Sequence, residues 1–184
     1  MIPPVNRSTS GKNILASLPR RVATAIRASP QTPYSGSCAL TTSVIACTMS
    51  EALGEINQAV ESGADIVELR IDFLRSFNAA RDIRVLLDAC PVPCIVTYRP
   101  AWEGGQYEGE EEPRLAALWT AVECGAAYID CELLAAGEFF AAAPEGTRER
   151  SATQIILSSH NYENVPSEEE LAKIHAQCVA AGAD

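Results

Sequence analysis

From residue 43 onward, the chain alternates between short β-branched apolar runs and longer segments in which apolar residues recur at helical spacing. This alternation predicts strands at residues 43–48, 65–71, 93–98, 127–132 and 153–159. It also predicts helices at residues 51–62, 78–89, 111–124, 133–143 and 167–181. Strands that are separated by helices pair in parallel, so the pattern predicts an α/β fold with a parallel sheet.

Two local signals mark where predicted helices end and begin. Gly63 follows the first helix, at the position where a glycine commonly closes a helix. The last helix opens with Ser167 and, three residues later, Glu170, which is the spacing of a capping box.

Polar residues stand within or just after several predicted strands. They are Glu68, Arg70, Arg99, Asp130, Glu132 and His160. A dinucleotide-binding sheet needs a glycine-rich turn after its first strand, and residues 47–54 (CTMSEALG) lack that fingerprint. Side chains that converge from the carboxyl ends of successive strands are instead typical of a (β/α)8 barrel.

The chain is short for such a barrel, which runs to about 250 residues. Its 184 residues contain only five predicted strand–helix units. It closes on Gly182-Ala183-Asp184, which repeats the Gly63-Ala64-Asp65 that precedes the second strand. We therefore expect residues 43–184 to form a (β/α)8 barrel truncated to about its first five βα units.

Three strand-associated residues are candidates for ligand binding. Glu68 and Arg70 lie two apart in a strand, so their side chains point to the same face. A carboxylate accepts hydrogen bonds and a guanidinium donates them, so the two can hold a hydroxylated or anionic ligand. A structural ion pair inside the barrel is the alternative. Arg99 suits the same ligand at the end of the third strand.

Glu103 follows in a loop that contains two adjacent glycines, and residue chemistry alone leaves it open between function and a solvated face. The acidic run at residues 108–112 suits a helix start, because carboxylates stabilise a helix N-terminus. The imidazole of His160 suits proton transfer, with a structural role as the alternative. The other histidine, His175, is expected on a helix surface.

The charge is divided unevenly along the chain. Residues 1–50 carry five basic residues and no acid, whereas the remainder carries nine basic and 24 acidic residues. The net charge of −10 argues against nucleic-acid binding, and no apolar run reaches the length of a membrane span. Residues 1–42 are rich in Ser and Thr and lack acids, which is typical of a transit peptide for a plastid or mitochondrion. A disordered tail is the alternative.

The seven cysteines show no CxxC motif and no Cys/His pair at zinc spacing. Most lie in or beside apolar runs, where a free cysteine acts as a small hydrophobe. We expect reduced thiols and neither a metal site nor a disulfide framework.

Four motifs in order resemble the type I 3-dehydroquinate dehydratases, above all the dehydratase half of the bifunctional plant and algal enzymes that also carry shikimate dehydrogenase. The motifs are ELRID (68–72), TYRPAWEGGQ (97–106), YIDCEL (128–133) and SSHNY (158–162). The resemblance implies a (β/α)8 barrel that converts 3-dehydroquinate to 3-dehydroshikimate in the shikimate pathway, through an imine between the substrate and a lysine. It implies no other cofactor.

The resemblance also implies roles for individual residues. His160 matches the general acid/base that removes the C2 proton and helps expel the hydroxyl group, and Glu103 matches the acid that orients it. Glu68, Arg70 and Arg99 match residues that hold the hydroxyls of the substrate. Cys47 stands where some relatives have a serine near the substrate, and is a weaker candidate for substrate binding.

The imine lysine of the family lies on the sixth strand, after a Gly-Ala-Asp like the one at residues 182–184. The only lysines here, Lys12 and Lys173, are not placed for Schiff-base chemistry. We therefore expect an N-terminal fragment of a plastid dehydratase, inactive as it stands, with a shikimate dehydrogenase domain possible in the complete protein. A mitochondrial or cytoplasmic location is the alternative.

Two other hypotheses for the function remain open. One is a barrel remnant that binds a ligand or a partner without turnover. The other is an unrelated α/β enzyme acting on a phosphorylated substrate, against which the absence of a glycine-rich phosphate loop counts.

Overall fold

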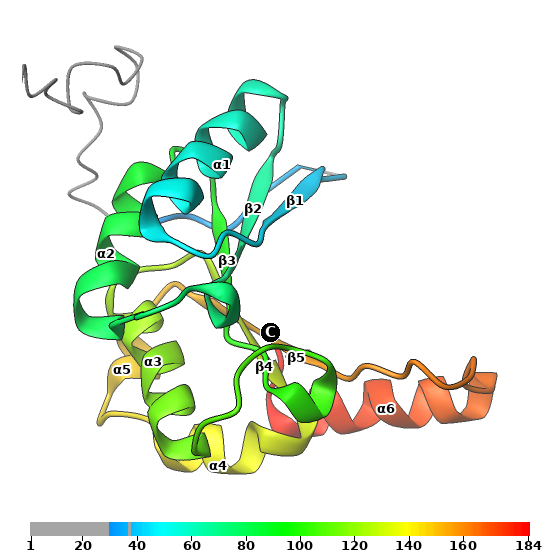
Figure 1. Ribbon diagram of the computed structural model, residues 1–184. Helices are drawn as coiled ribbons and strands as arrows, with labels where there is room; N and C mark the ends of the chain where they lie inside the picture. The colour runs from blue at the N-terminus through cyan, green and yellow to red at the C-terminus, as the bar shows by residue number, and fades with distance from the viewer. Residues whose placement is uncertain (1–29, 37) are drawn as a thin grey trace, which may run out of the picture.

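The computed structural model describes residues 30–36 and 38–184. Of the transit peptide expected at residues 1–42, residues 1–29 and 37 lie outside the described part. Strands and helices alternate along the chain (Figure 1). The order is β1 (Thr41–Val44), α1 (Met49–Glu61), β2 (Ile66–Arg70), α2 (Ala79–Ala89), β3 (Cys94–Thr97), α3 (Glu111–Glu123), β4 (Tyr128–Glu132), α4 (Ala136–Ala141), α5 (Thr147–Arg150), β5 (Gln154–Ser158) and α6 (Glu168–Ala181).

The five strands form one parallel sheet in the order β1-β2-β3-β4-β5. Each strand therefore pairs with the next strand in sequence, for example Thr41 with Ile66 and Glu132 with Ser158. A doubly wound sheet reverses its strand order at a switch point, and a barrel does not. The predicted parallel sheet and partial barrel are confirmed.

The two faces of the sheet differ in chemistry. One face packs against α1, α2 and α3, which lie along the same side of the strands (Figure 1), and it carries the apolar core. Val67 and Leu69 on β2 are buried there. Glu68 and Arg70 alternate with them and face the interior of the barrel, because successive side chains in a strand point to opposite sides.

The first strand begins and ends earlier than the sequence predicts. We expected residues 43–48, and β1 is Thr41–Val44. The reason is the following helix: Thr48 is the N-cap of α1 and forms a capping box with Glu51. The chain must therefore leave the sheet before Thr48. The capping box predicted at Ser167 and Glu170 is confirmed, with Ser167 as the N-cap of α6.

The helix expected at residues 133–143 is divided. A 3-10 turn at Leu133–Ala135 comes first and α4 follows, ending at Ala141. The short helix α5, Thr147–Arg150, has no counterpart among the predicted elements.

Gln31 forms hydrogen bonds at the amino ends of β3 and β4. It lies within residues 1–42, the segment that we expected to be a transit peptide. Gln31 is 4% exposed. Its amide nitrogen donates to Val92 O at 3.2 Å, and its amide oxygen accepts from Cys94 N at 2.7 Å and from Ala127 N at 3.3 Å. The side chain thus satisfies backbone groups at the start of two strands.

The two Gly-Ala-Asp sequences dock in the same way. Asp65 donates its backbone N–H to Leu40 O and accepts from Leu40 N at 2.9 Å. Asp184 donates its backbone N–H to Ile155 O and accepts from Ile155 N at 2.9 Å. Each aspartate therefore clips the chain to the preceding strand. Within the described residues, no helix combines the length and apolar character that crossing a membrane requires.

Candidate active site at the carboxyl ends of the strands

Glu68 is the centre of a hydrogen-bonded layer inside the barrel. Thr97 on β3 donates its hydroxyl to Glu68 Oε1 at 2.9 Å, and Ser43 on β1 donates its hydroxyl to Glu68 Oε2. Two neighbouring strands thus fix the carboxylate. Each of its oxygens keeps further acceptor capacity for a ligand hydroxyl.

Arg70 forms its ion pair with Asp72 and not with Glu68. Its Nε and Nη2 donate to the two carboxylate oxygens of Asp72 at 2.9 and 2.8 Å, and its guanidinium lies 5.0 Å from the centre of the Phe73 ring. The structural ion pair of Arg70 therefore has Asp72, and not Glu68, as its partner. The bidentate contact fixes the plane of the guanidinium and leaves Nη1 to donate elsewhere.

Arg99 is buried directly after β3. Its Nε donates to Glu103 O at 2.7 Å, across a loop that turns back on itself. Gly105 makes that turn possible, because a Cβ there would lie 2.0 Å from Arg99 O. The loop thus holds Arg99 and Glu103 in a fixed relation.

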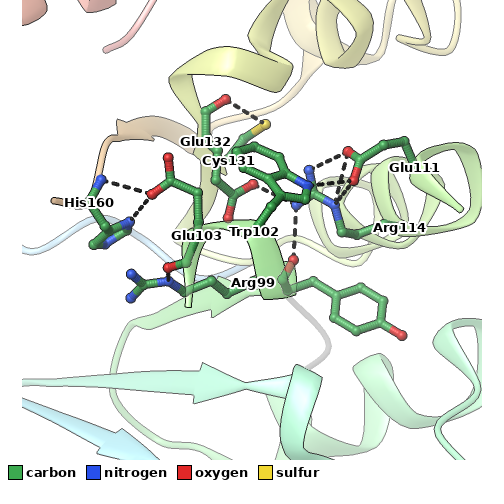
Figure 2. Close-up of polar contacts among 9 residues, drawn as sticks. Arg99, Trp102, Glu103, Glu111, Arg114, Cys131, Glu132 and His160 are labelled. Atoms are coloured by element: carbon green, nitrogen blue, oxygen red, sulfur yellow. Dashed lines mark hydrogen bonds and ion pairs between the residues drawn. The ribbon is translucent and has the colours of Figure 1, made fainter. Parts of the chain in front are cut away.

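Glu103 and His160 meet, although 57 residues separate them in the chain. Glu103 Oε2 lies 2.8 Å from His160 Nδ1 and also accepts from the His160 backbone N–H at 2.8 Å (Figure 2). The Glu103 side chain is 7% exposed and the His160 side chain 29% exposed. The carboxylate is thus largely shielded, while the imidazole remains accessible.

This contact fixes the orientation of the imidazole. A carboxylate can only accept, so Nδ1 carries the hydrogen that points at Glu103. In the neutral ring, Nε2 is then the basic nitrogen and is free to take a proton from a ligand. A base that is oriented by a second group is what general acid/base catalysis requires.

A second charged cluster, formed by Arg114, Glu111 and Glu132, lies next to the site. Arg114 on α3 is fully buried, and it donates to Glu132 Oε2 at 2.6 Å, to Glu111 Oε2 at 2.6 Å and to Tyr98 O at 2.9 Å. Glu132 at the end of β4 lies between Arg114 and Glu103 (Figure 2). Burial raises the pKa of Glu132, and Arg114 offsets part of that rise.

Asp130 belongs to the interior layer of Glu68. Burial raises its pKa to about 7, and the carboxylates of Glu132 and Glu68 add to the rise. Within the described residues, Asp130 Oδ1 is buried and has no hydrogen-bond partner.

The remaining candidates lie as follows. Cys47, three residues past the end of β1, is a half-buried free thiol. Lys173 and His175 are exposed on α6. Lys12 lies outside the described residues.

Three residues that complete the site were not predicted from the sequence. Asp72 belongs to the ELRID motif, but it reaches Arg70 only because the chain turns into a 3-10 helix at Ile71–Phe73. Arg114 stands among the apolar residues of α3, and a cation on a core-facing helix side was its only signal. Tyr162 belongs to the SSHNY motif, and its hydroxyl accepts from Arg99 Nη2 at 2.5 Å.

Comparisons with known families match nearly all of the described chain. The sequence model described as Type I 3-dehydroquinase matches residues 40–184. The bifunctional 3-dehydroquinate dehydratase/shikimate dehydrogenase, chloroplastic, of Arabidopsis thaliana is 43% identical over 141 residues, which are 77% of this chain and 23% of that protein. The 3-dehydroquinate dehydratase of Desulfotalea psychrophila is 39% identical over 122 residues, which are 66% of this chain and 52% of that protein. The chain thus spans about half or less of these relatives.

Solved structures agree on the fold. The type I 3-dehydroquinate dehydratase of Clostridium difficile superimposes with a TM-score of 0.73 at 19% identity, over 81% of this chain and 61% of that one. The 3-dehydroquinate dehydratase of Enterococcus faecalis gives a TM-score of 0.67 at 24% identity, over 81% of this chain and 64% of that one. At these identities, the likeness establishes the shared barrel architecture.

Proposed function

The chain belongs to the type I 3-dehydroquinase family, and on that premise we propose that its site binds 3-dehydroquinate and serves the dehydration of that compound to 3-dehydroshikimate. The observation that carries the proposal is the contact of 2.8 Å between Glu103 and His160 Nδ1. It presents an oriented and accessible base at the carboxyl ends of the strands, where barrels of this class build their sites.

His160 is the proposed acid and base. In the complete protein, its Nε2 takes the proton from C2 of the substrate, and the ring becomes positively charged beside the Glu103 carboxylate, which stabilises it. The same proton then passes to the departing hydroxyl group, which leaves as water while the carbon–carbon double bond forms. His160 returns to its neutral form, so the proton balance closes.

The substrate hydroxyls are assigned to Glu68, Arg70 and Arg99. Glu68 accepts hydrogen bonds, and its orientation is fixed by Ser43 and Thr97. The two guanidiniums donate, and each is itself held at its Nε. Fixing these groups in advance reduces the entropy lost when a ligand binds.

We further propose that these 184 residues bind the substrate without turning it over. The family resemblance assigns the acidification of C2 to an imine with a lysine, and Lys173 lies on the exposed side of α6. A general base alone contributes on the order of 10²–10⁴-fold. That factor is small beside the accelerations of at least about 10⁶-fold that are typical of enzymes.

Calorimetric titration of the chain with 3-dehydroquinate tests the proposal. We expect saturable binding that Glu68→Gln and Arg99→Met each weaken by about tenfold or more, because each removes a hydrogen bond to a charged group. Arg84→Met, on the outer helix α2, is the matched control and should leave binding unchanged. Circular dichroism shows whether each variant is folded.

An absorbance assay for the conjugated carbonyl of the product tests turnover in the same samples. No product above background is expected. Product formation that His160→Ala abolishes would overturn the proposal of binding without turnover. Folded wild-type protein that binds no 3-dehydroquinate would overturn the proposed ligand.

We also propose a plastid location and a second, dehydrogenase domain in the complete protein. The acid-free composition of residues 1–42 supports the first, and the Arabidopsis relative, which is chloroplastic and bifunctional, supports both. A fluorescent fusion to residues 1–42 should enter plastids, and accumulation elsewhere would refute the location. Sequencing the transcript beyond the codon for Asp184 should reveal the second domain, and an immediate stop codon would refute it.

A further inference from the structure

Tyr162, in the loop that follows β5, lies against Arg99. Its hydroxyl oxygen accepts from Arg99 Nη2 at 2.5 Å, and the Arg99 guanidinium carbon lies 5.6 Å from the centre of its ring. The ring and the hydroxyl therefore both contact one cation. Neither the family resemblance nor the strand pattern assigned Tyr162 a role.

The loop after β3 is shaped to receive this ring. Gly104 has φ +79°, which a side chain would strain, and a Cβ there would lie 2.9 Å from Tyr162 Cε2. Glycine at this position thus permits both the turn and the close approach of the tyrosine. The fit indicates that Tyr162 is seated against the loop, although its surface is 74% exposed.

The two contacts of Arg99 together fix its guanidinium. Nε donates to Glu103 O at 2.7 Å, and Nη2 donates to Tyr162 Oη. In this arrangement Tyr162 is the acceptor, so its own hydroxyl hydrogen is free to be donated. A hydrogen bond from a cation polarises the hydroxyl and makes it a stronger donor.

We propose that Tyr162 is a further ligand-positioning residue, which orients the Arg99 guanidinium and donates its hydroxyl hydrogen to an oxygen atom of a polyhydroxylated ligand held by Arg70 and Arg99. The identity of the ligand rests on the proposed function. The orientation of Arg99 rests on the contacts alone.

Tyr162→Phe removes the hydroxyl and keeps the ring. We expect the dissociation constant for 3-dehydroquinate to rise about tenfold, because one hydrogen bond to the ligand is lost and Arg99 is held less firmly. Tyr34→Phe is the matched control, since that hydroxyl donates to Cys38 O before β1, away from the site. Its affinity should equal that of the wild type.

A measurement without ligand separates this proposal from the proposed function. In nitrogen-detected NMR spectra of the arginine side chains, the Arg99 Nη signals should show hindered rotation in the wild type and faster rotation in Tyr162→Phe. If the wild type binds 3-dehydroquinate and Tyr162→Phe binds it equally well, the positioning role is overturned and the proposed function stands. If the wild type binds none, the proposed function fails, and the Arg99 signals alone decide whether Tyr162 orients the guanidinium: unchanged signals overturn the proposal.

Discussion

The two ends of the same five strands are built in opposite ways. At the amino ends, a neutral amide, Gln31, satisfies backbone groups of β3 and β4 and is itself buried. At the carboxyl ends, charged side chains gather, and two buried carboxylate oxygens, Asp130 Oδ1 and Glu132 Oε1, have no partner within the described residues. The polar groups at the amino ends are thus satisfied by the chain itself, whereas two buried acceptors at the carboxyl ends are not satisfied by the described residues. The comparison indicates that the amino ends of the strands contribute to stability, whereas the carboxyl ends carry the reactive groups, as in other barrels of this class.

Among the substitutions that test this comparison, the largest loss of stability is expected at Arg114. Arg114→Met leaves Glu132 as a buried carboxylate without its counter-charge. Removing one partner of a buried ion pair typically costs about 3–5 kcal/mol of the free energy of unfolding. Urea denaturation measures the loss. Arg84→Met is the matched control, because the Arg84–Asp88 pair is half exposed, and it should change stability by less than about 1 kcal/mol. Equal effects of the two variants would contradict the buried cluster.

Asp130, at the carboxyl ends of the strands, should make the stability of the protein depend on pH. Burial raises its pKa from 3.8 to about 7, so between these values the folded state binds more protons than the unfolded state. The stability that the protonated carboxyl contributes is fully present below pH 3.8 and is lost as the pH rises through about 7. Asp130→Asn avoids this loss, so it should be more stable than the wild type at pH 8, by on the order of 3 kcal/mol.

Thermal denaturation at two pH values measures that gain. At pH 4 the advantage of Asp130→Asn should have largely vanished, because the wild-type carboxyl is then mostly protonated in the folded state. Asp88→Asn, on the outer face of α2, is the control and should change stability little at either pH. An advantage of the same size at both pH values would show that Asp130 is not titrating in this window.

The smallest loss of stability is expected at Gln31, which tests the amino ends of the strands. Gln31→Ala removes the hydrogen bonds that Gln31 makes with buried backbone groups at the start of β3 and β4, which costs about 1–3 kcal/mol. Gln58→Ala, on the exposed side of α1, is the control and should have little effect. Because Gln31 lies at the amino ends, 3-dehydroquinate binding by the folded variant should be unchanged. A loss of binding without a loss of stability would contradict the division of roles between the two ends.

The sequence predicts the fold well because the alternation of strands and helices is a local pattern. It places Glu103 and His160 at the carboxyl ends of different strands, but their contact depends on how the loop after β3 turns back. Asp72 was missed because a 3-10 turn carries it back to Arg70. Gln31 was missed because its partners lie about 60 to 100 residues away, and no local pattern marks it. Contacts of this kind are set by tertiary packing.

The most direct test of the proposed site is the state of the His160 ring. The chain has two histidines, so nitrogen–proton correlation spectra are simple, and His175 on α6 serves as an internal reference. In the neutral ring, His160 should carry its hydrogen on Nδ1, and adding 3-dehydroquinate should shift its Nε2 signal in a saturable way while His175 stays unchanged. A hydrogen on Nε2, or no response of His160 to the ligand in folded protein, would contradict the assignment of His160 as the oriented base of this site.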